Sequence, residues 1–187
     1  TASDNVAVGR HALTNNTTGT YNTAVGRASL GSNTTGNYNT GVGRQAMNSN
    51  TVGINNIAIG PNSLVGNTTG SNNTAIGRNA LSTPTGANDN VAVGHAALQL
   101  ATVSHNVGVG VSALTATTTG GNNSAVGTRA LVANTTGASS VAIGYEALKA
   151  ATTGGSNTAI GYAAGFGIVG GTDNVAIGKN TLYNNNV

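Results

Sequence analysis

The chain of 187 residues has little of what a conventional globular domain is built from. It contains no cysteine and no tryptophan, one phenylalanine and one methionine, so disulfides and thiolate metal sites are excluded. A core of large side chains is excluded as well, because too few are present to offset the conformational entropy of folding. No apolar run approaches the length of a membrane span and no signal-peptide pattern occurs, so we expect no membrane insertion by this segment.

Charge is also scarce, at 6% of residues, while 38% are hydrophobic. Disordered segments usually combine low hydrophobicity with high charge, so this composition favours an ordered chain whose solubility comes from Asn, Thr and Ser. The seven Lys and Arg residues are spread thinly along the chain. A nucleic-acid partner would require a dense basic patch with stacking aromatics, so none is expected.

The residues that could carry catalysis are few and scattered. The only carboxylates are Asp4, Asp89, Glu146 and Asp173, and no two occupy equivalent places in neighbouring repeat units. The three histidines lie at different unit positions or far apart, and no phosphate-binding loop or recurring Asp-containing calcium loop is found. The sequence therefore predicts no enzyme, with no catalytic residues, no metal site and no cofactor.

A β-branched residue followed by glycine recurs along the whole chain. Ten intervals separate eleven such glycines; nine are 17 residues long, and the one from Gly94 to Gly110 is 16. The glycines are Gly9, Gly26, Gly43, Gly60, Gly77, Gly94, Gly110, Gly127, Gly144, Gly161 and Gly178. Chance does not produce this spacing, so the chain is a tandem array of one unit.

Around each glycine the unit reads roughly Asn-(Thr/Val)-Ala-(Val/Ile)-Gly-x-x-Ala-Leu, followed by a polar stretch that often contains Thr-Thr-Gly. Two apolar columns are predicted to form the repeat core. The first is Val8, Val25, Val42, Ile59, Ile76, Val93, Val109, Val126, Ile143, Ile160 and Ile177. The second is Leu13, Leu30, Met47, Leu64, Leu81, Leu98, Leu114, Leu131, Leu148 and Leu182, broken once by Gly165.

A unit of this length has room for two short strands and two turns, but not for a helix with its connections. One unit cannot bury its own apolar face, whereas stacked units form a continuous narrow core. We therefore expect an all-β parallel β-roll or β-solenoid of about eleven 17-residue coils, a single domain over residues 1–187. Both ends fall inside a unit, so we expect the chain to be an excerpt of a longer fibre. The Ala/Gly face of each strand is our candidate for close approach between chains.

Glycine also marks the turn that precedes each strand, at Gly36 and its equivalents. In this column Gly86 is displaced by one residue, and Ser104 replaces the glycine in the shortened unit. An asparagine such as Asn22 opens each strand, with Ser140 as the exception. These residue types are typical of turns.

The unit Ser140-Val-Ala-Ile-Gly-Tyr-Glu-Ala-Leu148, like Asn73-Thr-Ala-Ile-Gly-Arg-Asn-Ala-Leu81, resembles the head repeat of trimeric autotransporter adhesins (YadA-like heads). The Asn-Thr-Thr-Gly stretches also resemble repeats of phage tail-fibre proteins. The resemblance covers essentially the whole chain and implies a left-handed β-roll, three chains about a common axis, and a place on a cell or virion surface. The unit is longer than the compact adhesin repeat, and Asn stands where adhesins often have Ser. Adhesin and phage fibre therefore both stay open.

Two sets of side chains at the position after the strand glycine are candidates for surface binding. They are Arg10, Arg27, Arg44 and Arg78, and Tyr145 and Tyr162. The arginines could form a basic stripe that meets anionic glycans, or a solvated edge whose stems cover the core. The tyrosines could form a sugar-binding platform or a packing pair.

Together with the repeat, the resemblance implies a structural and adhesive segment of an extracellular trimeric surface fibre that attaches to a glycan or protein receptor on a host or other cell. One alternative is a monomeric ice-binding solenoid, because pairs such as Thr34-Thr35 recur along the chain. Adjacent threonines in a strand point to opposite faces, however, which is unlike an ice-binding ladder. The other alternative is a self-polymerising extracellular filament, suggested by the absence of visible caps.

Overall fold

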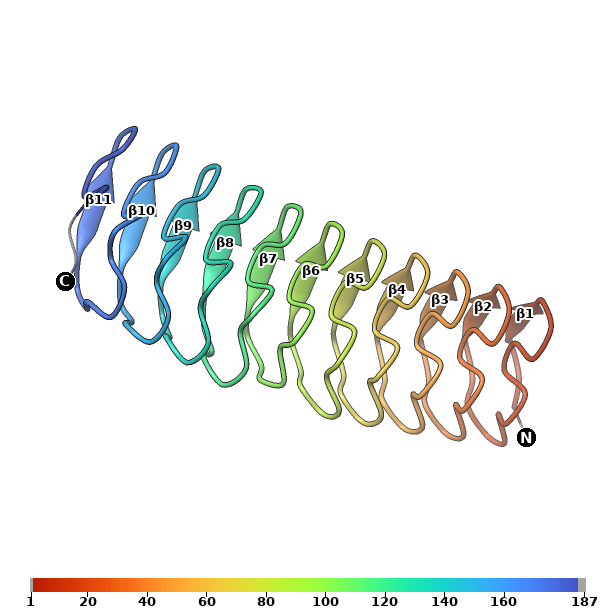
Figure 1. Cartoon of the computed structure of the whole chain (residues 1–187). Coiled ribbons are helices and arrows are strands. Elements are labelled where there is room, and N and C mark those ends of the chain that lie inside the picture. The colour runs from red at the N-terminus through yellow and green to blue at the C-terminus, as the bar shows by residue number, and fades with distance from the viewer. Residues whose placement is uncertain (1, 185–187) are drawn as a thin grey trace.

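The computed structural model describes residues 2–184, so both ends of the predicted 1–187 domain lie outside the described residues. The described chain is all-β and winds into a stack of coils, each with one three-residue strand (Figure 1). The strands are β1 (Val6–Val8), β2 (Thr23–Val25), β3 (Thr40–Val42), β4 (Ile57–Ile59), β5 (Thr74–Ile76), β6 (Val91–Val93), β7 (Val107–Val109), β8 (Ser124–Val126), β9 (Val141–Ile143), β10 (Thr158–Ile160) and β11 (Val175–Ile177).

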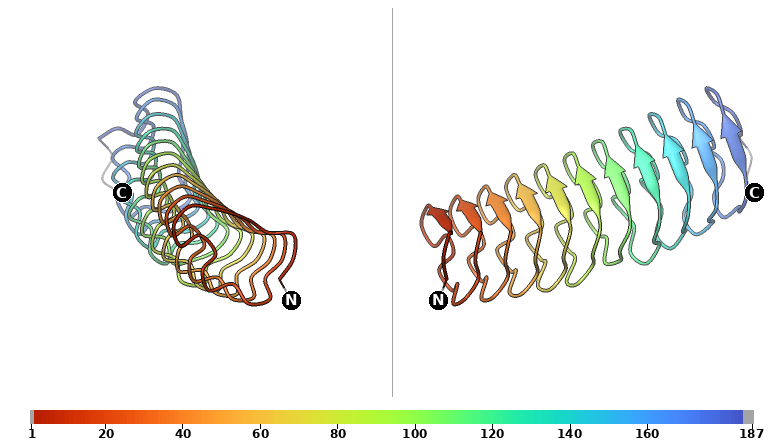
Figure 2. Two further views of the ribbon diagram at one scale, coloured as in Figure 1. Left: turned by 90° about the vertical axis from the view of Figure 1, so that its right-hand side faces the viewer. Right: turned by 180° about the vertical axis from the view of Figure 1, so that it is seen from behind.

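The eleven strands form one parallel sheet in sequence order, β1 to β11. Each strand pairs with the equivalent residues of the next unit; Val25, for example, lies opposite Val42. At about 4.8 Å between neighbouring strands, the sheet is roughly 50 Å long. Seen down the stack, successive coils are offset steadily in one direction, while the view from behind shows the strands side by side along the rod (Figure 2). The predicted solenoid and its period are confirmed.

The expectation of two strands in each unit is wrong. Outside β1 to β11 the described chain forms turns and bends, because residues in the left-handed backbone region interrupt it. These turns still bond to the next coil: the amide of Leu30 donates to Ala46 (3.0 Å) and that of Thr34 donates to Thr51 (2.9 Å). Nearly the whole circumference of a coil is therefore hydrogen-bonded to its neighbour, which satisfies the backbone without a second strand.

The leucine column adopts a backbone conformation that leucine rarely takes, with φ of 49° at Leu30 and 45° at Leu81. A left-handed residue of this type costs about 1–2 kcal/mol. Leu30, Leu64 and Leu81 are fully buried, and burial of such a side chain contributes about 1.5–3 kcal/mol. Burial thus offsets the backbone strain, so the predicted place of the leucines in the core is confirmed.

Only glycine fits at the end of each strand. Gly77 has a φ of 129°, and a Cβ placed there would lie 2.6 Å from the carbonyl oxygen of Gly94 in the next coil. Both the conformation and the close approach of the two coils exclude a side chain. The glycine column therefore allows neighbouring coils to approach closely at the corner where the chain leaves each strand.

The prediction that the Val/Ile column lies in the core is wrong. In β2 it is Ala24 that is buried, while Thr23 and Val25 face outward; the same alternation runs through β2 to β10. The interior between the strand and the leucines is narrow, and the leucines already fill it. Only a methyl group or a hydrogen fits there, so the Ala/Gly face points inward. The expectation that this face approaches another chain is wrong for the same reason.

Buried asparagines connect the strands to the turns. The amide nitrogen of Asn39 donates to Asn22 Oδ1 (3.0 Å), and Asn39 Nδ2 donates to the carbonyl of Gly53 (2.8 Å). Asn56 repeats this arrangement one coil later. Because these side chains are fully buried, their polar atoms require partners, and the repeat supplies them from the adjacent coil.

A second asparagine ladder runs through the polar turn. Asn50 Nδ2 donates to Asn33 Oδ1 (2.8 Å), and Asn67 Nδ2 donates to Asn50 Oδ1 (2.9 Å). The ladder stops where the next unit has Pro84 instead of asparagine, and Asn67 Oδ1 is left buried without a partner. Asn134 Oδ1 is left in the same way, because Ala151 follows it.

The one break in the leucine column is repaired within the same coil. Gly165 keeps the left-handed conformation, with a φ of 65°. Ile168, which stands at the position of the turn asparagines Asn50 and Asn67, is fully buried. Its Cδ1 would lie 3.3 Å from a Cβ at position 165, so its side chain fills the space of the missing leucine. The coil keeps its core volume because an apolar side chain, that of Ile168, replaces a polar one at the turn position.

The shortened unit lacks one residue in its polar turn. The prediction that Ser104 replaces the turn glycine of this unit is wrong. Ser104 Oγ accepts from the amide of Asn88 (2.9 Å), just as Asn88 Oδ1 accepts from the amide of Ser71 (2.8 Å). Ser104 is therefore equivalent to Asn88. Val103 alone takes the place of the two residues, Gly86 and Ala87, that precede Asn88 in the longer unit. The turn-glycine place in the preceding coil is taken by Ala87, whose carbonyl accepts from Asn73 Nδ2 (2.8 Å). The shortened neighbour leaves space for the Ala87 methyl.

The turn ladder predicts unequal effects of the same substitution. Replacing Asn50 by Ala removes a donor to Asn33 and the acceptor of Asn67, so we expect a loss of about 1–3 kcal/mol in the free energy of unfolding. Replacing Asn134 by Ala removes, in addition to its hydrogen-bond donor, a buried oxygen that already lacks a partner. The loss in the free energy of unfolding should therefore be smaller than for Asn50→Ala. Urea unfolding of both variants measures the difference; equal costs would contradict the ladder as described.

Candidate binding surface

The outer strand face is a uniform surface that runs along the rod. We define it as the first and third residues of β1 to β11, and all of them are Val, Ile or Thr except Ser124. No charged residue occurs among them. Ile59, Ile76 and Ile143 are 40%, 37% and 41% exposed although they lie in the middle of the stack. The face is β-branched and carries no charge, and along the described stack its side chains are exposed or half-buried.

The predicted arginine column is assembled as expected. The carbonyls of Arg10, Arg27 and Arg44 each accept a hydrogen bond from the next coil, at 2.9, 2.9 and 3.0 Å, so their backbones are stacked in register. All three side chains are exposed, and Pro61 separates them from the exposed Arg78. Within residues 2–184, none of these four arginines forms an ion pair with a carboxylate. The column is an unneutralised basic edge.

The predicted tyrosine pair is also in contact. The rings of Tyr145 and Tyr162 stack with centroids 5.2 Å apart and an angle of 16° between their planes. Lys179 Nζ lies 5.7 Å from the centre of the Tyr162 ring, on the next coil of the same column. The pair is exposed, so it can serve both as packing and as an aromatic contact surface.

A second aromatic pair was missed by sequence reasoning. Tyr21 and Tyr38 stack with centroids 5.0 Å apart and are 52% and 58% exposed. Each stands directly before the asparagine that opens its strand, in a column whose members all have positive φ. The signal was present in the sequence as two tyrosines 17 residues apart in neighbouring units.

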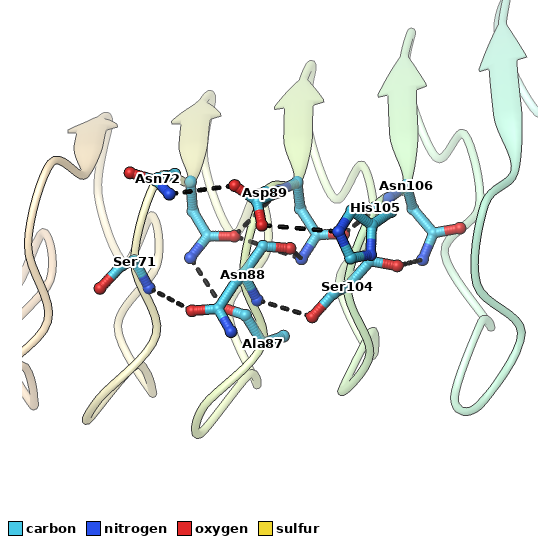
Figure 3. A network of polar contacts seen from close by, with 10 residues as sticks. Ser71, Asn72, Ala87, Asn88, Asp89, Ser104, His105 and Asn106 are labelled. Carbon is cyan, nitrogen blue, oxygen red and sulfur yellow. Dashed lines mark hydrogen bonds and ion pairs between the residues drawn. The ribbon is translucent and has the colours of Figure 1, made fainter.

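The same column continues beyond the tyrosines as a polar ladder (Figure 3). Asn72 Nδ2 donates to Asp89 Oδ1 (3.0 Å), and the imidazole of His105 lies 3.6 Å from Asp89 Oδ2. A parallel row of Ser71, Asn88 and Ser104 links the coils beside it. The ladder presents the exposed side chains of Asn72, Asp89 and His105 to solvent.

The Thr-Thr pairs lie in turns rather than on a flat face. The hydroxyl of Thr34 donates to the carbonyl of Thr51 (3.0 Å), and Thr135 donates in the same way to Thr152 (3.0 Å). These hydroxyls therefore join adjacent coils. The threonine ladder considered for ice binding is mainly structural.

One ionic cluster lies toward the other end of the rod. Glu146 Oε1 is 2.8 Å from Arg129 Nη1 and 2.9 Å from Lys149 Nζ. Burial acts to raise the pKa of the Glu146 carboxyl, but the hydrogen bond from Lys149 and the charges of Lys149 and Arg129 outweigh it. The pKa of Glu146 is consequently lower than usual.

No family model, no curated protein and no solved structure matches this chain. The function is therefore argued from the surfaces of the rod. Within residues 2–184, no group of three or more His, Asp or Glu side chains could hold a metal ion. No helix in the described part of the chain has the length and apolarity needed to cross a membrane.

The lowered pKa of Glu146 predicts a pH-dependent contribution to stability. The contribution is present above the ordinary glutamate pKa and is lost as the pH falls through the lower folded-state value. Replacing Glu146 by Gln should cost about 0.5–1 kcal/mol at pH 7 and less at pH 3. Urea unfolding of both proteins at the two pH values tests this; a deficit that is no smaller at pH 3 would contradict an ionic origin.

Proposed function

We propose that this chain is a structural and adhesive segment of an extracellular surface fibre, in which three copies pack about a common axis. The observation that carries the proposal is the outer strand face, a continuous stripe of outward-facing Val, Ile and Thr whose side chains are exposed or half-buried from strand to strand. Exposed stripes of this kind mark interaction surfaces in soluble proteins.

A second copy of the same chain is the occupant that suits this face. The stripe repeats in every coil and lacks charge, so the same stripe on another copy of the chain is chemically compatible with it. Its area is on the order of 500 Å² per chain, from about 4.8 Å per strand and about 7 Å between the two outward residues, plus the width of their side chains. Burying this area contributes roughly 10 kcal/mol per chain before the costs of association.

The number of chains, the handedness and the location at a bacterial or virion surface come from the resemblance of the repeat to YadA-like heads and tail-fibre repeats. The polar and aromatic columns support the adhesive part of the proposal. They are not part of the outer strand face, and they offer tyrosines, amides and arginines to a receptor.

A charge on the outer strand face tests the assembly. Light scattering coupled to size exclusion should give the mass of three chains for the unmodified protein. Replacing Ile76 by Lys places one positive charge from each chain in the shared interface, so we expect the mass of a single chain. Circular dichroism should be unchanged, because Ile76 faces outward within one chain.

The matched control is Val52→Lys. Val52 is 46% exposed, but it lies in the polar turn rather than on a strand, so this variant should keep the mass of three chains. Retention of the trimer by the Ile76 variant would contradict packing through the strand face.

Ice binding is the second candidate, supported by a different set of residues from the Thr-Thr pairs. The outer strand face is itself a regular array of Thr, Val and Ile. A single-chain mass for the unmodified protein, together with thermal hysteresis that is lost in the Ile76→Lys variant, would favour it over the fibre.

A further inference from the structure

The basic edge formed by Arg10, Arg27 and Arg44 has an electrostatic feature that indicates what kind of receptor the adhesive surface binds. The three residues stand in adjacent coils whose backbones are hydrogen-bonded at this position, so their Cα atoms are spaced by about 4.8 Å. This spacing is well within the Debye length at physiological salt, so the three positive charges repel one another.

The rest of the chain shows how such charges are balanced elsewhere. Arg129 and Lys149 share the carboxylate of Glu146 at 2.8 and 2.9 Å. Arg10, Arg27 and Arg44 are exposed and have no carboxylate within 4.0 Å among residues 2–184. A ligand that carries several regularly spaced negative groups would supply the missing counter-charge.

A hollow lies beside this edge. Its volume is about 280 Å³, and its walls include His11, Thr14, Asn15, Ser32 and Asn48. Gly31 also lines the hollow and stands between Thr14 and Asn48 in a column where most units carry a side chain; a Cβ at Gly31 would lie 2.6 Å from Asn48 Oδ1. The edge and the hollow are joined by Arg10, whose Nε donates to His11 Nε2 (3.1 Å).

The lining of the hollow indicates the class of ligand. Hydroxyl, amide and imidazole groups are the partners that the hydroxyls of a sugar use, and the volume is just below the range of about 300–1,000 Å³ typical of drug-sized sites. One sugar ring is thus a suitable occupant. Neither tyrosine pair borders the hollow, and stacking aromatics are what single-stranded nucleic acid uses.

We propose that this surface binds an acidic polysaccharide. Its sulfate or carboxylate groups lie on Arg10, Arg27 and Arg44, and one of its sugar rings occupies the hollow at Gly31. The proposal rests on the adhesive function above and names the ligand class and the site for it.

Binding of dextran sulfate, with neutral dextran as the reference, tests the inference. The unmodified protein should bind dextran sulfate and not dextran. The double variant Arg27→Gln/Arg44→Gln should lose at least tenfold in affinity, and its affinity should depend less steeply on salt concentration. The matched control is Arg129→Gln/Lys149→Gln, which removes the same net charge at the cluster around Glu146 and should bind as tightly as the unmodified protein.

A third variant separates the hollow from the arginines. Gly31→Asn fills the hollow without changing charge, and the Asn48 side chain can turn aside. It should weaken binding severalfold while leaving the salt dependence unchanged. Equal losses in the two charge variants, no loss in Arg27→Gln/Arg44→Gln, or no binding by the unmodified protein would each overturn the proposal.

The mass of each sample distinguishes failure of the polysaccharide site from failure of the fibre proposal. A three-chain particle that does not bind dextran sulfate overturns the ligand site alone. A single chain that binds it, with the expected pattern among the variants, supports the site and contradicts the trimeric assembly.

Discussion

The structure depends on one constraint, which is that each coil hydrogen-bonds to the next in a fixed register around nearly its whole circumference. The amides of Thr40, Leu64 and Thr68, on three different parts of the unit, all reach the equivalent part of the following coil. Because the register does not slip, every side chain has a counterpart from the same column above and below it. Backbone bonding therefore does for this chain what large side chains do in an ordinary core.

The register turns single residue choices into continuous features. Asparagines form buried ladders because each supplies the partner that the previous one needs, as Asn33, Asn50 and Asn67 do. On the surface the same rule gathers tyrosines into stacks and arginines into a basic edge. The constraint also explains how exceptions are accommodated: a residue that breaks a column is compensated close by, as Ile168 compensates for Gly165 within one coil.

Much of the fold could be predicted from the sequence, because a period of 17 residues with Gly at a fixed place leaves few architectures. The stacking of Tyr145 on Tyr162 followed from the same period. The inward face of the strand could not be read in this way. In a three-residue strand such as Thr23–Val25, alternation separates two faces but does not say which is inside. Side-chain size favours the larger residues for the core, whereas the buried leucines leave room only for Ala24. The Tyr21–Tyr38 stack was within reach of the period, but left-handed positions such as these are not marked by any one residue type.

The measurement that tests the central claim most directly is the distance between pairs of spin labels placed along the rod, in labelled chains diluted with unlabelled ones. The chain has no cysteine, so single substitutions at exposed Thr35, Thr119, Thr136 and Thr153 give unique attachment sites. From Thr35, the other three lie five, six and seven coils away. The account predicts distances of about 24, 29 and 34 Å, which rise by one strand spacing for each unit. Broad distributions, or distances that do not rise by equal steps, would contradict a stack of coils in one register.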